Sequence, residues 1–190
     1  MEKKQSFAAP IIVLSCICLV VSIALALTFK VADPIIQANA EASAVAARQQ
    51  LLPAADSFTA AEGVELAGSE DGKAQVQEIY TADNGAGCVM TVETKSFGGS
   101  LTMMVGLDAD GAITGVTVTE HADTPGVGTK DMEPDYLAQY TGMNALSSAG
   151  NIKKEAAPFV YISGASVSGQ AIHSGVAAAL AQYAAIGGAQ

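Results

Sequence analysis

The hydrophobic pattern of the chain begins with one uninterrupted apolar run. Phe7 to Phe29 contains no charged residue, and at about 1.5 Å per residue a helix of this length crosses a ~30 Å hydrocarbon core. Lys3 and Lys4 precede the run, whereas Lys30 alone follows it closely. Because cytoplasmic flanks are richer in Lys and Arg, the sequence predicts a single span of the cell membrane, with residues 1–6 in the cytoplasm and the remainder outside.

A cleaved signal peptide is the alternative interpretation of this run. Val13 to Cys16 faintly resembles a lipoprotein cleavage box. Cleavage there would leave Ile17 to Phe29 as a stranded apolar segment. The length of the run therefore favours an uncleaved anchor.

An alanine-rich stretch follows the predicted span. Pro34 is expected to break the helix, which should resume from Ile35 to Leu52 and stop at Pro53. This second helix is either a juxtamembrane stalk or a helix packed on the domain that follows. Ser57 to Lys73 is rich in Gly, Ser and acidic residues and predicts a loop with one short strand. Residues 30–73 are thus expected to form a juxtamembrane helix and linker.

Alternating apolar and polar positions begin at residue 74 and predict two β-hairpins. The expected strands are Gln75–Ala82, Cys88–Thr94, Leu101–Leu107 and Ala112–Glu120. Asn84-Gly85 and Asp110-Gly111 separate the paired strands, and these dipeptides supply the positive φ angles of tight turns. Leu101, Met103, Val105 and Leu107 alternate with other residues in the third of these strands, so one face of that strand is expected to pack on a core.

Helices are concentrated in the last third of the chain. The pattern predicts a short helix over Pro134–Tyr140, a strand over Phe159–Ile162, and a final helix from Val167 onward. Its buried stripe is expected to consist of Ile172, Val176, Leu180 and Tyr183, with Gln170, His173 and Gln182 on its other faces. An antiparallel sheet followed in the sequence by helices indicates an α+β fold for residues 74–190.

Charge and cysteine content exclude several classes of function. The net charge is −10, and from Val31 onward 18 acidic residues face 6 basic ones, so the exported part carries −12 and would repel nucleic acid. Cys88 is the only cysteine after the apolar run, which leaves it without a disulfide partner. His121 and His173 lack the spacing of metal ligands, and no metal site or Fe–S centre is expected.

The sequence from Ser163 to Ser166 predicts a phosphate site. Ser166 falls at the expected N-cap of the final helix, where free backbone amides and the positive end of the helix dipole favour an anion. Gly164 and Ala165 are small enough for close approach of a ligand, and Ser163 can donate a further hydrogen bond. The alternative is an ordinary serine N-cap after a tight turn.

A second loop has the composition of a type II turn. Thr124-Pro125-Gly126-Val127 places Pro at the second position and Gly at the third, where a positive φ is required. Such a turn offers backbone groups to a ligand, although turns of this composition also occur without any ligand.

Four ordered motifs together resemble a known family. They are Phe97-Gly98-Gly99 before the strand at Leu101, that strand with its turn through Gly111, His121 to Gly128, and Ser163 to Ser166. Over Val76–Ala184 the chain resembles the FMN-binding domain shared by the G subunit of Rnf electron transport complexes and the C subunit of sodium-pumping NADH:quinone reductases. The apolar run and the alanine-rich stretch resemble the Rnf protein of this pair.

The resemblance implies a covalently bound cofactor. In that family a separate flavin transferase uses FAD to esterify the FMN phosphate to the last hydroxyl residue of the Ser-Gly-Ala-Thr/Ser signature, here Ser166. Asp123, Thr124, Pro125 and Gly126 would lie along the flavin. The chain departs from the usual signature twice, with Ser166 in place of Thr and with Val160 where Asp is usual.

By the same resemblance the chain would be an electron-transfer subunit without catalytic residues of its own. It would assemble with the other Rnf subunits, in a complex that couples electron flow between ferredoxin and NAD to movement of Na⁺ or H⁺. The alternatives are the C subunit of the NADH:quinone reductase, a free-standing exported flavoprotein, or a flavin-free anchored binding module in which Ser166 only caps a helix.

Overall fold

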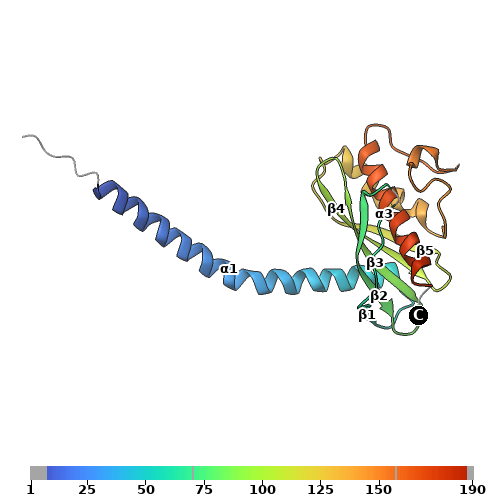
Figure 1. Ribbon diagram of the computed structural model, residues 1–190, viewed down its shortest axis with the longest axis horizontal. Helices are drawn as coiled ribbons and strands as arrows, with labels where there is room; N and C mark the ends of the chain where they lie inside the picture. Colours follow the sequence, from blue (N-terminus) through green and yellow to red (C-terminus); the bar gives the residue numbers. More distant parts are fainter. Residues whose placement is uncertain (1–7, 70, 157, 188–190) are drawn as a thin grey trace, which may run out of the picture. The chain divides into compact units, whose positions relative to one another are not determined.

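The computed structural model describes residues 8–69, 71–156 and 158–187 (Figure 1). The expected cytoplasmic segment 1–6 and Phe7, the first residue of the predicted span, lie outside the described residues. Helix α1 (Ala8–Leu51) contains the described part of the apolar run, from Ala8 to Phe29. It is the one helix in the described part of the chain that is long and apolar enough to cross a membrane. This finding fits a single-pass membrane protein.

The expected helix break at Pro34 is wrong. Pro34 lies inside α1, and the predicted span and the alanine-rich helix are one continuous element. Proline removes one backbone hydrogen bond and crowds the preceding turn, but the sequence on either side favours helix strongly. Across the proline, the Gln37 side-chain amide also donates to Asp33 over 3.0 Å, one helical turn apart.

The last turn of α1 packs on the folded domain, which begins at Ala46. The Arg48 guanidinium lies 3.5 Å from the centre of the Tyr80 ring, and Arg48 is only 4% exposed. Thr114 Oγ1 donates to the Leu51 carbonyl over 2.5 Å. Of the two interpretations of the alanine-rich helix, packing on the domain therefore holds for its C-terminal end.

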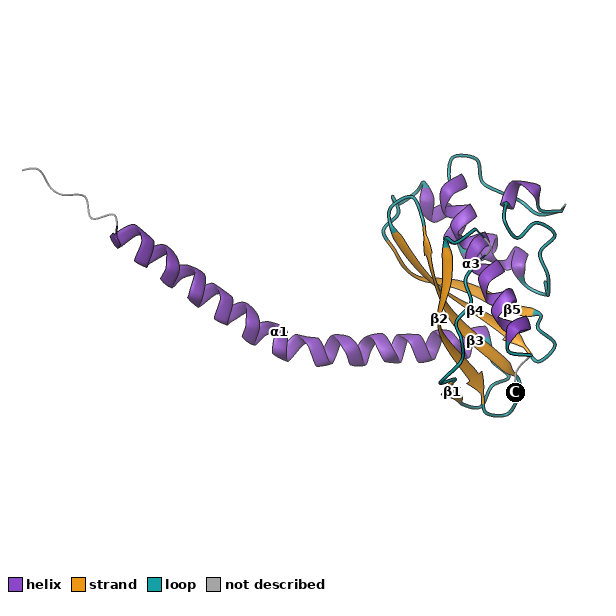
Figure 2. Ribbon diagram, viewed as in Figure 1, coloured by secondary structure: helices purple, strands orange, loops and turns teal. Residues whose placement is uncertain are grey.

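Five antiparallel strands form the sheet, in the order of the sequence (Figure 2). They are β1 (Phe58–Ala60), β2 (Ala74–Ala82), β3 (Gly87–Lys95), β4 (Ser100–Asp108) and β5 (Ile113–His121). Both predicted hairpins are confirmed, and Gly85 and Gly111 have the positive φ values of 72° and 79° that their turns require.

Helical segments follow the sheet and confirm the α+β class. They are η1 (Gly128–Met132), α2 (Pro134–Leu137), η2 (Ala138–Tyr140), η3 (Ile152–Lys154) and α3 (Ser166–Ala185). The expected strand over Phe159–Ile162 is wrong, because this segment pairs with no strand in the described structure. Phe159 instead packs edge-on against Tyr140, with ring centres 5.1 Å apart, which accounts for its apolar character.

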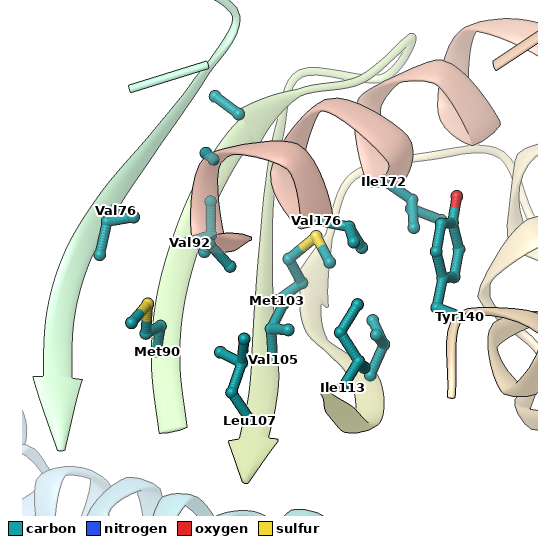
Figure 3. Packing of buried hydrophobic residues seen from close by; sticks show 14 of the residues in the cluster. Val76, Met90, Val92, Met103, Val105, Leu107, Ile113, Tyr140, Ile172 and Val176 are labelled. Atoms are coloured by element: carbon teal, nitrogen blue, oxygen red, sulfur yellow. The ribbon is translucent and has the colours of Figure 1, made fainter. Parts of the chain in front are cut away.

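Helix α3 packs on β2, β3 and β4, and the core lies between them. Figure 3 shows Ile172 and Val176 pointing from α3 into this core, together with Met103 and Val105 of β4. Because side chains alternate along a strand, Gly106 faces the other side of the sheet, where Leu51 of α1 covers it.

His173 and Gln182 are fully buried, which corrects their expected place on the open faces of the last helix. Loops cover both residues. His173 Nε2 lies 2.9 Å from the Ser148 carbonyl, and the Gln182 amide donates to the Glu65 carbonyl over 3.1 Å. Burial is the largest influence on His173 and lowers its pKa, which favours the neutral ring.

Candidate functional site

Two neighbouring cavities lie on either side of the first turn of α3. The first has a volume of about 190 Å³ and is lined by Phe97, Asp123, Thr124, Val127, Gly128, Gly164, Ala165, Val167 and Ser168. The second has a volume of about 550 Å³ and is lined by Lys73, Lys95, Ser96, Asn151, Ile152, Lys153, Ser166, Val167, Gln170 and Ala171. Val167 lines both cavities, so the first turn of α3 separates them.

A tight turn from Ile162 to Ala165 immediately precedes α3. The Ala165 amide donates to the Ile162 carbonyl over 3.3 Å, and Gly164 has a φ of 97°, a conformation that a side chain would strain. Ser163 and Gly164 are the central residues of the turn. Nothing lies within 4 Å of the place where a side chain on Gly164 would project, so this edge of the first cavity is open.

The expected N-cap role of Ser166 is wrong by one residue. Ser166 is the first residue of α3, and the N-cap is Ala165, whose methyl group makes no capping hydrogen bond. The first-turn amides therefore lack the side-chain acceptor that usually satisfies them. An anion at this helix end would meet those amides and the positive end of the helix dipole.

The loop from Thr124 forms the opposite wall of the first cavity. The Val127 amide donates to the Thr124 carbonyl over 3.3 Å, and Gly126 has a φ of 77°, as the sequence predicts for this turn. Thr124 and Val127 line the cavity, whereas Pro125 and Gly126 shape the turn without lining it.

Asp123 connects the Thr124 loop to the segment that contains Ser96 and Gly98. The residue is 4% exposed, and its carboxylate accepts hydrogen bonds from the Ser96 hydroxyl and the Gly98 amide. Burial raises the pKa of Asp123, but these bonds and one from Ser168 outweigh it, so the net pKa lies below the ordinary value. Because its oxygens are engaged by protein groups, Asp123 positions the loop against α3.

Exposed apolar side chains surround the first cavity. Phe97, Val127 and Val167 line it, yet they are 75%, 53% and 51% exposed. Single exposed apolar residues are ordinary, but several converging on one cavity indicate a surface that a ligand or partner covers. A flat aromatic ligand suits such a surface.

Asp131 lies beneath the same helix end. It is 0% exposed, and neither carboxylate oxygen makes a hydrogen bond of ordinary geometry within the described residues. Burial raises the pKa of Asp131 to about 6, although the Gly169 amide acts in the opposite direction. The Asp131 carboxyl group therefore binds its proton more tightly in the folded protein than in the unfolded chain.

We expect Asp131→Asn to stabilise the protein above pH 6. With a folded pKa of about 6 against an ordinary 3.8, the free energy of unfolding falls as pH rises through this window, by about 2–3 kcal/mol. The amide has the same shape and no charge, so this pH dependence should shrink. Thermal unfolding between pH 4 and pH 7.5 checks it, with the exposed Asp110→Asn as control. Destabilisation of Asp131→Asn at pH 7.5 would contradict the interpretation.

The structure brings most of the sequence-predicted site residues together. Asp123, Thr124, Gly164 and Ala165 line the first cavity and Ser166 the second, while Ser163 lies in the turn between Ile162 and Ala165. Sequence reasoning did not identify the other lining residues, above all Val167, Ser168 and three lysines from distant segments. Phe97, Val127 and Gly128 did have a signal, because each belongs to one of the recognised motifs.

Comparison with known proteins identifies the family to which the chain is similar. The family described as the FMN-binding domain matches residues 96–181, a range that includes Phe97, the Thr124 turn and Ser166. The G subunit of the Na(+)-translocating ferredoxin:NAD(+) oxidoreductase complex of Acetobacterium woodii is 32% identical over 186 residues, covering 90% of this chain and 89% of the relative.

A further relative and a solved structure are also similar to this chain. The G subunit of the ion-translocating oxidoreductase complex of Stutzerimonas stutzeri is 27% identical, covering 88% of this chain and 76% of the relative. Among solved structures, NqrC of Shewanella oneidensis matches with a TM-score of 0.44 and 21% identity, over 57% of this chain and 61% of that one.

The fold and the two cavities, together with the matched domain, define the class of the protein: an α+β FMN-binding domain preceded by an apolar helix long enough to span a membrane. Within that class, the chain belongs to the G-subunit family of ion-translocating oxidoreductase complexes of the Rnf type. The resemblance identified from the sequence is confirmed.

Proposed function

We propose that this chain carries FMN as a phosphate ester of Ser166 and transfers electrons as the G subunit of a ferredoxin:NAD⁺ oxidoreductase complex that translocates Na⁺ or H⁺. The observation that carries the proposal is the position of Ser166. It is the first residue of an uncapped helix and lines one cavity, while the next residue, Val167, lines both.

The residues at the site fit FMN. The uncapped amides at the start of α3 suit the phosphate, and the exposed side chains of Phe97, Val127 and Val167 suit a planar ring. The bound flavin supplies the one- and two-electron redox chemistry. Protein residues fix its position: the ester prevents its dissociation, and Asp123 holds the neighbouring loop in place.

Attachment is a phosphoryl transfer from FAD by a separate flavin transferase. Ser166 Oγ forms the bond to the FMN phosphorus, the pyrophosphate bond to AMP breaks, AMP leaves and the hydroxyl proton is released. Serine offers the same oxygen nucleophile as threonine and lacks only the methyl group that restricts its rotamers. The exposed Val160 occupies the place where the transferase signature usually has Asp.

The apolar helix and the relatives support an extracytoplasmic location of the domain within a membrane complex. With Lys3 and Lys4 before the apolar run, the N-terminus would be cytoplasmic and the flavin on the outer side of the membrane. The relatives named as G subunits match most of the chain, which favours an Rnf-type complex over a free-standing exported flavoprotein. The other subunits of the complex are its proposed partners.

Detection of protein-bound flavin after denaturation tests the proposal. The full-length protein, produced with and without a flavin transferase, should show a flavin-fluorescent band on a denaturing gel only when the transferase is present. Mass spectrometry of the proteolytic peptide that contains Ser166 should then locate the modification. Absence of the band when the transferase is active would contradict covalent attachment.

A further inference from the structure

Three lysines line the cavity that contains Ser166. Lys73 precedes β2, Lys95 ends β3, and Lys153 lies in η3. They are half of the six basic residues that follow Val31, in a part of the chain with 18 acidic residues. We refer to Lys73, Lys95 and Lys153 as the lysine cluster.

Lys73 and Lys95 are cross-strand neighbours. The Lys95 amide donates to the Lys73 carbonyl over 3.2 Å, and the register pairs Ala74 with Thr94 beside them. Like charges placed opposite one another on adjacent strands are destabilising. A negative charge in the cavity between them would relieve this repulsion.

Ion pairing inside the protein neutralises the lysine cluster only in part. Lys73 Nζ lies 3.5 Å from Asp71, and this is the only ion pair of the cluster within the described residues. The Asp71 carboxylate also accepts hydrogen bonds from Ser69 and Ser174. Lys153 Nζ lies 5.4 Å above the ring of Tyr161, a cation–π contact that leaves its charge in place.

We propose that the lysine cluster is the phosphate-recognition site of this domain. Its ammonium groups would attract the FMN phosphate to Ser166, together with the pyrophosphate of the FAD donor, and would then compensate the remaining charge of the phosphodiester. The inference rests on the proposed function. The cluster also places three positive charges at the cavity, in a part of the chain whose net charge of −12 would repel an anionic flavin.

Reversible flavin binding isolates the role of charge. In full-length Ser166→Ala, which cannot form the ester, FMN should bind about tenfold more tightly than riboflavin, which lacks the phosphate. This preference should be strongly reduced in the Ser166→Ala background with K73Q, K95Q and K153Q, where only the helix amides remain for the phosphate, and should weaken with added salt. Fluorescence titration with both flavins measures it. Equal affinities for FMN and riboflavin before the lysines are changed would overturn the inference.

Matched variants separate charge from structure. K130Q with K154Q removes two lysines that do not line the cavity and should keep the preference for FMN. Replacing the cluster with K73R, K95R and K153R retains the charges and should restore it. Thermal unfolding shows whether each variant is folded. A preference lost equally in the control pair would overturn the inference, because a general charge effect would then explain it.

Covalent loading distinguishes this inference from the proposed function. With Ser166 present and a flavin transferase supplied, the triple Gln variant should be loaded about tenfold more slowly than the parent. If the parent is loaded and the triple variant matches its rate, with the preference for FMN also unchanged, the lysine cluster has no role but the proposed function stands. If the parent neither binds nor is loaded with flavin, both fail.

Discussion

Ser166→Ala is expected to remove all covalently bound flavin. Alanine has no hydroxyl group, so no phosphate ester can form at the first residue of α3. The fold should be retained, because Ser166 is not the N-cap and its hydroxyl makes no capping bond; the expected change in stability is within about 0.5 kcal/mol. In-gel flavin fluorescence, normalised to protein, should fall to background.

Two hydroxyl variants make this result specific. Ser166→Thr retains the nucleophilic oxygen and should be loaded to the level of the parent protein. Ser163→Ala should also be loaded, because Ser163 lies in the turn and lines neither cavity. If fluorescence survives in Ser166→Ala and is lost in Ser163→Ala, the attachment residue is Ser163 and the proposed site is wrong.

Gly98→Ala is expected to destabilise the domain by about 2–3 kcal/mol and to impair flavin binding. A methyl group there would lie 2.2 Å from the carbonyl oxygen and 2.5 Å from the carbonyl carbon of Ala122. Both are backbone atoms, so either the Phe97 loop or the Asp123 loop must move. The hydrogen bond from the Gly98 amide to Asp123 would weaken with that movement.

Gly150→Ala is the matched control, because nothing lies within 4 Å of the added methyl group and the backbone φ is not positive. Denaturant unfolding of both variants gives the difference in free energy, and flavin loading gives the effect on the site. A Gly98→Ala protein as stable and as fully loaded as the control would show that the contact between the two loops is dispensable.

Local sequence patterns were sufficient for much of the fold. The apolar run, the two hairpins and the final helix depend on periodicity and on Asn-Gly or Asp-Gly turns, which act over a few residues. The motif resemblance was sufficient for the family, and it directed attention to Ser166 and the Thr124 turn. Thr124 and Val127 of the turn line the first cavity, and Ser166 lines the second.

Two of the errors arose where distant residues determine the local structure. Phe159–Ile162 has the composition of a strand, but Phe159 packs on Tyr140 and His173 instead. His173 and Gln182 occur at helical positions that suggest solvent, yet loops far away in sequence cover them. Helical periodicity identifies one buried face and cannot show that other faces are also covered.

The sequence by itself determined the apolar helix, the α+β hairpin domain and the start of the final helix to within one residue. Only the tertiary structure brought Lys73, Lys95 and Lys153 to the cavity that Ser166 also lines, made Ala165 rather than Ser166 the N-cap, and buried Asp131 below the same helix. The physical reason is the distance along the sequence over which the determining interactions act. Turns and periodicity are encoded by neighbouring residues. A charged cavity depends on strand register and on loops that come together only when the chain folds.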